Sequence, residues 1–203
     1  MTGNAGSLFV LASGSTARVQ ILKNAGLAFE VDPAYVDETA IKDVCRTEGL
    51  SADKAAVRLA EAKALVVATR WPGALVVGAD QLLVSGSTWF DKPESIAAAR
   101  TTLQALRGGR HRLISAAVAV RDGIVLWRHV DTAELTMRPY SERFLDWYMS
   151  QTTAFDLQVV GACRLEGSGI QAFQRIEGDF FTILGLPLLP LLDFLRGEGL
   201  LID

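Results

Sequence analysis

The sequence contains few of the residues that bind transition metals or form disulfide bonds. Its 203 residues include only two cysteines and two histidines, and Cys45 and Cys163 lie far apart. This leaves little material for a transition-metal site and favours a reducing compartment, so we expect a cytoplasmic protein. Long apolar runs are also missing. The longest, residues 183–192, is well below the ~18 residues of a membrane span, so we expect no span. The N-terminal apolar run covers only residues 8–12 and no basic residue precedes it, so we expect no signal peptide.

An excess of either charge is missing too. The 20 basic and 23 acidic side chains give a net charge of -3, which argues against a nucleic-acid coat and against a disordered acidic tail. We therefore expect no nucleic-acid partner and only local anion-binding sites. The length equals one to two domains at about 150 residues each. Because no Pro/Gly/Ser linker divides the chain, we expect a single domain over residues 1–203.

Hydrophobic patterns and turn residues predict alternating strands and helices. Asp122-Gly123 predicts a tight hairpin, and an acidic loop is expected through Asp37 and Glu38. Residues 82–84 either extend the preceding strand or begin a hairpin. The predicted fold class is α/β, with a mixed, twisted central β-sheet flanked by helices. Strands are expected at 8–12, 29–31, 74–79, 113–120 and 124–136, and within 157–162 and 170–176, and helices at 16–24, 52–70, 93–106, 141–150 and 187–196.

The first candidate site is the segment SGSTAR, residues 13–18. It follows a buried strand and opens a helix, so its backbone N–H groups suit a phosphate, and Arg18 adds a charged fork able to hold two phosphate oxygens. The alternative is an ordinary helix cap by Ser15 with a solvated arginine.

The second candidate is Asp80, which ends the apolar run 74–79. A carboxylate is costly to bury without a partner, and ligands in open α/β sheets bind beyond the carboxyl ends of strands. Asp80 is therefore a candidate for metal binding or water activation, and a turn cap is the alternative.

Other charged residues and one motif have ordinary structural explanations. Taken one by one, Lys63, Lys92 and Glu38 can each be a solvated surface charge. The sequence GSGIQA at 167–172 matches a dinucleotide-binding pattern but lacks the long helix that this pattern requires.

Seven segments stand out together, namely LASGSTARVQILKNAGL, VDE, LAEAKA, VVGADQ, DKPES, GGRH and GACRLEGSGIQAFQRIEGDFFTILGLP. In this order, and along nearly the whole chain, they resemble the Maf family of nucleoside triphosphate pyrophosphatases. The resemblance implies a cytoplasmic, usually dimeric α/β enzyme that splits a nucleoside triphosphate into a monophosphate and pyrophosphate with Mg²⁺ or Mn²⁺. It implies that Asp80 is the proton acceptor and that Asp80 with Glu38 holds the metal. It implies that phosphates are held by Ser13, Ser15, Arg18, Lys63 and Lys92.

Three positions depart from the commonest family pattern. Thr16-Ala17 replaces Pro-Arg, Gln81 follows the aspartate, and Glu166 stands where glutamine is usual. Gln81 with Glu166 resembles the branch that acts on 7-methyl-GTP, whose cationic base offers N–H donors to a carboxylate. Ala17 replaces a tryptophan of that branch, so a dTTP/UTP pyrophosphatase stays open. A nucleotide-binding regulator of septum formation without turnover is the alternative from another class.

Overall fold

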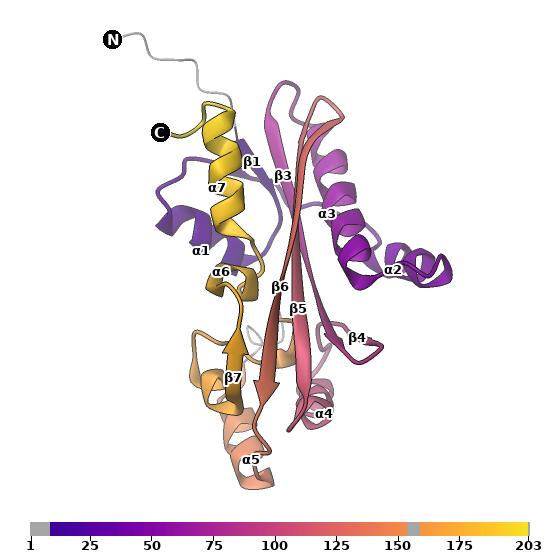
Figure 1. Cartoon of the computed structure of the whole chain (residues 1–203), viewed down its shortest axis with the longest axis vertical. Coiled ribbons are helices and arrows are strands. Elements are labelled where there is room, and N and C mark those ends of the chain that lie inside the picture. The colour runs from indigo at the N-terminus through magenta and orange to yellow at the C-terminus, as the bar shows by residue number, and fades with distance from the viewer. Residues whose placement is uncertain (1–8, 154–158, 203) are drawn as a thin grey trace. The chain divides into compact units, whose positions relative to one another are not determined.

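The computed structural model describes residues 9–153 and 159–202 as strands and helices in alternation (Figure 1). The strands are β1 (Phe9–Ala12), β2 (Glu30–Val31), β3 (Leu75–Ser85), β4 (Thr88–Phe90), β5 (Arg110–Arg121), β6 (Ile124–Met137) and β7 (Phe173–Glu177). The helices are α1 (Thr16–Asn24), α2 (Glu38–Thr47), α3 (Ala52–Ala68), α4 (Ile96–Leu106), α5 (Glu142–Gln151), α6 (Phe180–Ile183) and α7 (Leu188–Gly197). Two 3₁₀ turns, η2 (Val160–Ala162) and η3 (Ser168–Ala172), precede β7.

The strands form one mixed sheet of seven, which confirms the predicted fold class. Their order is β2-β1-β3-β5-β6-β7, and β4 pairs with β3 beside this path. β1 is parallel to β2 and β3, with Ala12 opposite Gly78, whereas β3–β4 and β6–β7 are antiparallel. The predicted hairpin joins β5 to β6, and both turn residues have positive φ, 49° at Asp122 and 78° at Gly123. Glycine adopts this conformation without strain, as the turn requires.

Backbone packing divides the chain into two compact units. The first contains the residues up to Asp80, Ser115–Asp131 and the residues from Leu184 onward, and the second contains Gln81–Ile114 and Thr132–Ile183. Strands β3, β5 and β6 each contribute residues to both units. The single domain over residues 1–203 stays a prediction.

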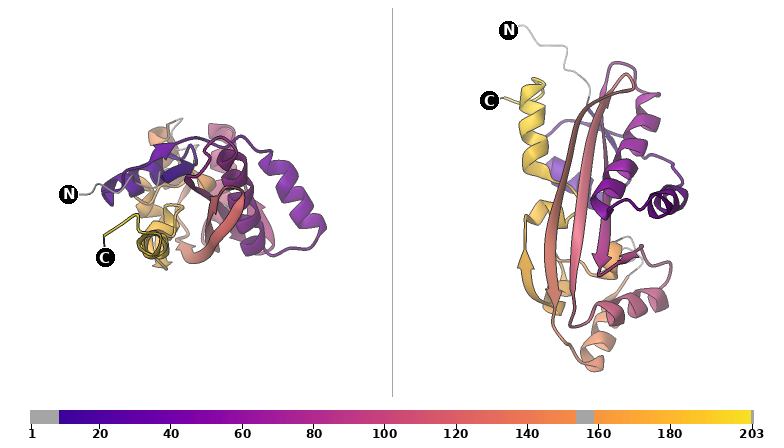
Figure 2. Two further views of the ribbon diagram at one scale, coloured as in Figure 1. Left: turned by 90° about the horizontal axis from the view of Figure 1, so that it is seen from above. Right: turned by 45° about the vertical axis from the view of Figure 1, so that its right-hand side comes forward.

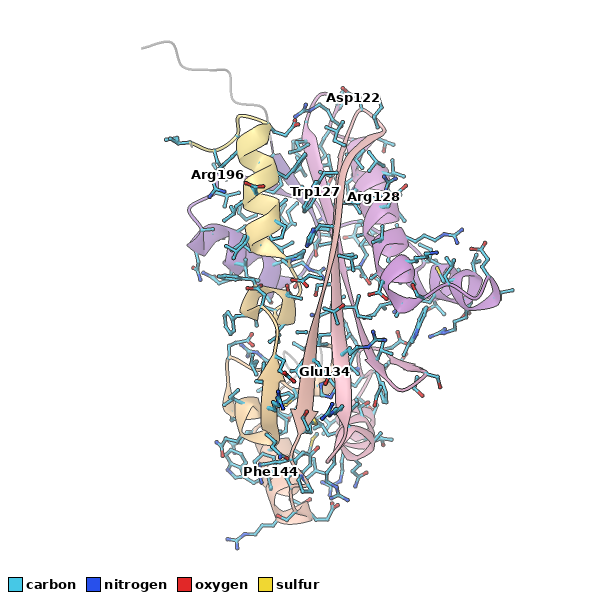
Figure 3. The ribbon with its side chains drawn as sticks, in the orientation of Figure 1. Asp122, Trp127, Arg128, Glu134, Phe144 and Arg196 are labelled. Atoms are coloured by element: carbon cyan, nitrogen blue, oxygen red, sulfur yellow. The ribbon has the colours of Figure 1, made fainter. Side chains whose placement is uncertain are left out.

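In the first unit, helices cover both faces of the sheet, as the two views of Figure 2 show. Successive residues of a strand point to opposite faces. On β6, Trp127 stacks on Phe194 of α7 with ring centroids 5.2 Å apart, and the next residue, Arg128, pairs with Glu61 of α3 at 2.8 Å. Figure 3 shows these two neighbours on opposite sides of the strand. Helices α7 and α3 therefore lie on opposite faces.

The second unit has its own hydrophobic core. Helices α4 and α5 contribute Leu103, Leu106 and Leu145, and β6 contributes Leu135 and Met137, all of them buried. Two tyrosines within this core donate hydrogen bonds to backbone carbonyls. The Tyr140 hydroxyl lies 2.6 Å from the oxygen of Leu103, and that of Tyr148 lies 3.1 Å from the oxygen of Ala162. Both phenolic groups are thus hydrogen-bonded within the core.

Several predicted elements are confirmed and several are wrong. β1, α1, α3, β5, β6, α5 and α7 lie where expected within a few residues. Both alternatives for residues 82–84 are confirmed. These residues extend β3, which runs to Ser85, and this end of β3 forms a hairpin with β4. The strand predicted within 157–162 is wrong for residues 160–162, which form η2, whereas 157 and 158 lie outside the described residues. The strand predicted within 170–176 is confirmed as β7, which begins at Phe173. The helix predicted from residue 93 begins at Ile96.

Within the described ranges, no helix has both the length and the apolar composition needed to cross a bilayer.

Candidate active site

The N-terminus of α1 is capped as the sequence predicts. The Ser15 hydroxyl accepts a hydrogen bond from the backbone N–H of Arg18 at 3.5 Å. The Ser13 hydroxyl accepts from the backbone N–H of Ser15 at 3.3 Å, and Ser13 is buried. Both serines therefore order the loop between β1 and α1. The N-terminus of α1 presents backbone N–H groups and the positive end of the helix dipole.

Arg18 is buried, so the alternative of a solvated arginine is wrong. Its side chain crosses to two backbone segments, where Nε donates to the carbonyl of Gly185 at 2.7 Å and Nη1 donates to that of Ala79 at 2.9 Å. Nη1 also donates to the Ser13 hydroxyl at 3.0 Å. Two of the three guanidinium nitrogens thus have protein acceptors, and Nη2 is the nitrogen that has none within the described residues.

The charge of Arg18 is set by opposing effects. Burial lowers the pKa of Arg18 below its ordinary value, and the negative charges of Asp80 and Glu38 act in the opposite direction. A guanidinium stays protonated under all these conditions. The first unit therefore holds a fixed positive charge close to two carboxylates.

Lys63 joins those two carboxylates. It lies on α3 and is 8% exposed, and its ammonium is 2.5 Å from Asp80 Oδ1 and 2.7 Å from Glu38 Oε1. Lys42 lies 3.9 Å from the other oxygen of Glu38. The interpretation of Lys63 as a solvated surface residue is therefore wrong, because a lysine at this depth needs its charge compensated.

Asp80 does not end its strand, which corrects the prediction. β3 continues to Ser85, and Asp80 is 5% exposed within it. The parallel partner β1 ends at Ala12, opposite Gly78, so Asp80 lies two residues beyond the parallel pairing. The side chain thus follows the carboxyl end of β1, where ligands of α/β sheets bind.

The helical position of Glu38 was not predicted, because its segment was interpreted as an acidic loop. In the structure Glu38 is the first residue of α2, and the Asp37 carboxylate caps this helix by accepting from the N–H of Ala40 at 2.9 Å. An aspartate cap, an acidic first turn and the apolar spacing of Ile41, Val44 and Cys45 were the available signal. The helix points Glu38 at Lys63.

The other predicted site residues divide between the units. Ala17 lies in α1, one residue before Arg18, and is partly buried. Lys92, Gln81 and Glu166 belong to the second unit, where Lys92 and Glu166 are exposed. Glu166 Oε1 lies 3.5 Å from Arg164 Nε. The structure therefore brings together Ser13, Ser15, Arg18, Glu38, Lys63 and Asp80, all in the first unit.

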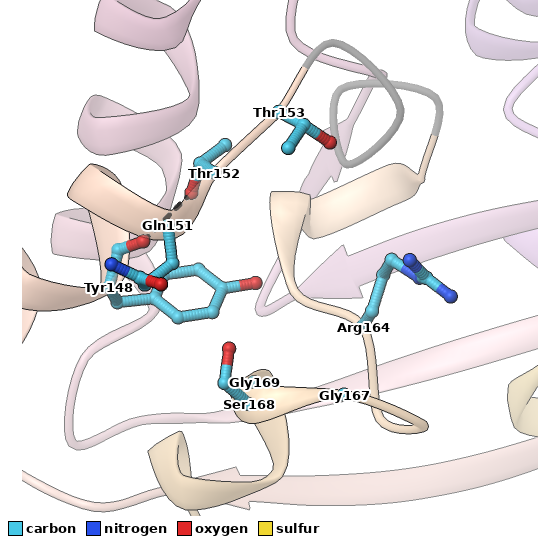
Figure 4. Close-up of a pocket in the computed structure, with 8 residues that line it drawn as sticks. All are labelled: Tyr148, Gln151, Thr152, Thr153, Arg164, Gly167, Ser168 and Gly169. Carbon is cyan, nitrogen blue, oxygen red and sulfur yellow. Dashed lines mark hydrogen bonds between the residues drawn. The ribbon is translucent and has the colours of Figure 1, made fainter.

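A pocket of about 310 Å³ lies beside the Glu166 loop in the second unit (Figure 4). Its wall is mostly polar and includes a glycine-rich turn, so it offers hydroxyl and backbone groups to a ligand. Sequence reasoning did not single out this pocket, because its residues come from the end of α5 and the two residues after it, from the loop between η2 and η3, and from the start of η3. They are Tyr148, Gln151, Thr152, Thr153, Arg164, Gly167, Ser168 and Gly169.

A preformed metal cage is absent from the described part of the chain, which contains no cluster of three or more potential metal-binding side chains. Glu38 and Asp80 supply two carboxylates, with the Lys63 ammonium between them. This donor set fits Mg²⁺, which is commonly held by one or two carboxylates together with substrate phosphates and water.

The fold and these contacts define an α/β protein with a charged site beyond the carboxyl end of a parallel strand, beside a helix N-terminus suited to a phosphate. The chain belongs to the Maf family, because the family model described as Maf-like protein matches residues 8–198.

Three relatives align with this chain over almost their full length. A protein of Paramagnetospirillum magneticum called nucleoside triphosphate pyrophosphatase is 54% identical over 95% of this chain and 100% of its own. Proteins called 7-methyl-GTP pyrophosphatase from Rhizobium etli and Mesorhizobium japonicum are 50% and 52% identical, each over 94% of this chain and 96% of their own. The resemblance stated from the sequence motifs is therefore confirmed.

Proposed function

We propose that this protein is a nucleoside triphosphate pyrophosphatase, which hydrolyses the α–β phosphoanhydride and releases a nucleoside monophosphate and pyrophosphate. The names of its relatives support this activity. The single observation that carries it is the buried group of Arg18, Lys63 and Asp80, joined through Glu38 and the Ala79 carbonyl. A protein that only bound a nucleotide would need the cations but not a buried carboxylate beside them.

The chemistry follows from these residue types. Water adds across the P–O–P bond, so the site must neutralise phosphate oxygens and direct one water toward phosphorus, which is mainly positioning and electrostatics. Arg18, Lys63 and the N–H groups at the start of α1 supply positive charge, and Lys92 is proposed to join them. Asp80 takes the proton of the attacking water. Lys63 holds the Asp80 carboxylate in place through its hydrogen bond.

Mg²⁺ or Mn²⁺ is the proposed cofactor, held by Glu38 and Asp80. The bound metal supplies positive charge to the phosphate oxygens in the transition state. Lys63 lies between the carboxylates, so these residues bind the cation best when a triphosphate brings further oxygen ligands.

The proposed substrate is a modified nucleotide such as 7-methyl-GTP, whose removal keeps it out of nucleic acid. Glu166 supports this preference, because a carboxylate favours a cationic base and accepts hydrogen bonds from its N–H groups. Gln81 is the second residue of the pattern, and Ala17 directly precedes Arg18, which is proposed to hold the phosphates. Two relatives carry the name 7-methyl-GTP pyrophosphatase. The competing substrates are dTTP and UTP.

One assay separates these possibilities. Purified protein is incubated with 7-methyl-GTP, GTP, dTTP and UTP, with Mg²⁺ or Mn²⁺, and pyrophosphate release is measured for wild type and Glu166→Gln. We expect kcat/KM to be highest for 7-methyl-GTP and this preference to shrink in the variant. Unchanged relative values would remove Glu166 from base selection, and the absence of any turnover would favour the septum regulator. We further propose that the protein works in the cytoplasm as a homodimer.

A further inference from the structure

The Glu38 carboxylate faces a second ammonium besides that of Lys63. Lys42 lies one turn further along α2, and its Nζ is 3.9 Å from Glu38 Oε2, whereas Lys63 Nζ is 2.7 Å from Oε1. A glutamate four residues before a lysine is the favourable order for an ion pair on a helix. Each oxygen of Glu38 therefore has an ammonium beside it, and the contact of Oε2 is the longer one.

The depth of Lys42 distinguishes this contact from an ordinary ion pair on a helix surface. The Lys42 side chain is 12% exposed. By comparison, the side chains of Arg46 and Arg196, each paired with an aspartate three residues earlier on its own helix, are 42% and 43% exposed. A lysine on a helix surface usually extends its ammonium into water. Lys42 instead brings a poorly solvated positive charge to the carboxylate that Lys63 also binds.

The charges of this group are not balanced. Three cations, Arg18, Lys42 and Lys63, lie in the first unit together with two carboxylates, Glu38 and Asp80. The group therefore has one positive charge in excess. Such an excess attracts a polyanion and opposes the binding of a divalent cation on its own.

A metal ion and Lys42 require the same carboxylate. In the proposed function Glu38 binds the metal, and Oε2 is the oxygen with the longer ammonium contact. Like charges this close to one atom repel each other. Once Oε2 is taken by the metal, Lys42 loses this carboxylate and needs negative charge in exchange, because a buried charge without compensation is costly. The phosphate oxygens of the substrate can supply that charge.

We propose that Lys42 is a further triphosphate-binding residue, which competes with the divalent cation for Glu38 in the free protein and binds a phosphate oxygen in the complex. The proposal rests on the proposed function, because it takes Glu38 as a metal ligand. It requires the metal and the triphosphate each to bind better in the presence of the other, and it assigns part of this coupling to Lys42.

The first test measures metal binding without turnover. Mn²⁺ alone is titrated into the nucleotide-free protein, and free Mn²⁺ is followed by electron paramagnetic resonance. Lys42→Met keeps an unbranched side chain and removes the charge, so we expect Mn²⁺ to bind about 3- to 10-fold more tightly than to wild type. A lysine that only held Glu38 in place would give weaker Mn²⁺ binding in this variant. Weaker or unchanged binding would overturn the proposal.

The second test measures the binding of inorganic triphosphate at a Mn²⁺ concentration that saturates each variant. We expect Lys42→Met to weaken this binding by about 10-fold or more, as the loss of a hydrogen bond between charged groups predicts. Lys42→Arg keeps the charge and should retain most of the affinity. The matched control is Lys54→Met, at an exposed position of α3 in the same unit, which should change neither affinity. Unchanged triphosphate binding in Lys42→Met would overturn the proposal.

This proposal and the proposed function fail in different ways. If wild type hydrolyses no nucleotide, the proposed function fails, while the two binding measurements still decide the role of Lys42. If wild type is active, Lys42→Met should raise KM and change kcat much less, the pattern of an interaction made equally with substrate and transition state. An active wild type with unchanged binding constants in Lys42→Met would remove Lys42 from the site and leave the pyrophosphatase activity in place.

Discussion

The ammonium of Lys63 lies 2.5 Å from the carboxylate of Asp80, and both residues are buried, at 8% and 5% exposed. This pair comes from the middle of α3 and from a strand 17 residues further along the chain. A buried pair of this kind contributes little to stability when its desolvation is counted. Its value is instead a carboxylate of fixed position and charge, which a reaction at phosphorus requires.

The first prediction concerns that carboxylate. We expect Asp80→Asn to lower kcat by about two to four orders of magnitude, the usual contribution of a positioned proton acceptor. The amide keeps the shape and still accepts the Lys63 hydrogen bond, so the fold should survive. Pyrophosphate release and circular dichroism measure the two effects.

Asp193→Asn is the matched control, because Asp193 is 89% exposed on α7. It should leave kcat unchanged. Near-normal turnover of Asp80→Asn would exclude Asp80 as the proton acceptor.

The second prediction concerns the metal. Removing divalent cations with EDTA should abolish turnover, and adding Mg²⁺ should restore it. In Glu38→Gln, the Mg²⁺ concentration for half-maximal rate should rise by at least about 10- to 100-fold, because loss of an outer-shell partner alone has that effect and Glu38 is proposed to bind the metal directly. The control is Glu48→Gln, which removes a surface carboxylate paired with Arg58. An unchanged Mg²⁺ requirement in Glu38→Gln would remove this residue from the metal site.

Local signals predicted much of the fold. The cap at Ser15 and the turn at Asp122-Gly123 each depend on a few neighbouring residues, and the structure confirms both. Such signals are readable because capping and turn geometry are set by adjacent residues. The α2 helix was not predicted because its mostly polar sequence was interpreted as a loop, although Ile41, Val44 and Cys45 have helical spacing.

Contacts between distant segments were not readable. Nothing near Arg18 in the sequence indicates that its guanidinium binds the carbonyls of Ala79 and Gly185, 61 and 167 residues away. Backbone acceptors leave no trace in residue type. The contacts of Gln81 could not be predicted for the same reason, since its Nε2 donates to the carbonyls of Thr182 and Ile183. The motifs therefore predicted which side chains form the site. The backbone carbonyls that orient these side chains became known only from the structure.

The third prediction concerns the packing that brings Lys63 to Asp80. A Cβ added to Gly78 of β3 would collide with the backbone of α3 at the Ala60 oxygen and the Ala64 nitrogen. Backbone atoms cannot move aside as a flexible side chain can, so Gly78→Ala should lower the free energy of unfolding by about 1–3 kcal/mol or more. Activity should fall as well, because α3 carries Lys63.

Gly197→Ala is its control, because the added Cβ meets nothing within 4 Å there. At this position in α7, alanine should be neutral or stabilise by at most about 1 kcal/mol. Urea unfolding of both variants measures the difference. Equal stability of the two variants would contradict close packing of α3 on β3.

The last prediction is a pH dependence carried by His111 in the second unit. His111 is 3% exposed, its Nδ1 has no hydrogen-bond partner, and its ring centroid lies 6.0 Å from that of Phe173. Burial lowers the pKa of His111 to about 4 from its usual 6.5. The unfolded chain therefore takes up this proton at higher pH than the folded protein does. Stability is unaffected above pH 6.5 and is lost as the pH falls from 6.5 toward 4, by about 2 kcal/mol at pH 5.

A variant without the titrating ring should lose this dependence. We expect His111→Leu, of similar size and apolar, to show a smaller decrease in the free energy of unfolding between pH 7 and pH 5 than wild type, by up to about 2 kcal/mol. His111→Asn, which keeps a polar group but does not titrate, serves as the second variant and should flatten the same curve even if it lowers stability at every pH. Urea unfolding at pH 7, 6 and 5 provides the comparison. Curves parallel to that of wild type in both variants would show that His111 does not carry the acid sensitivity of the second unit.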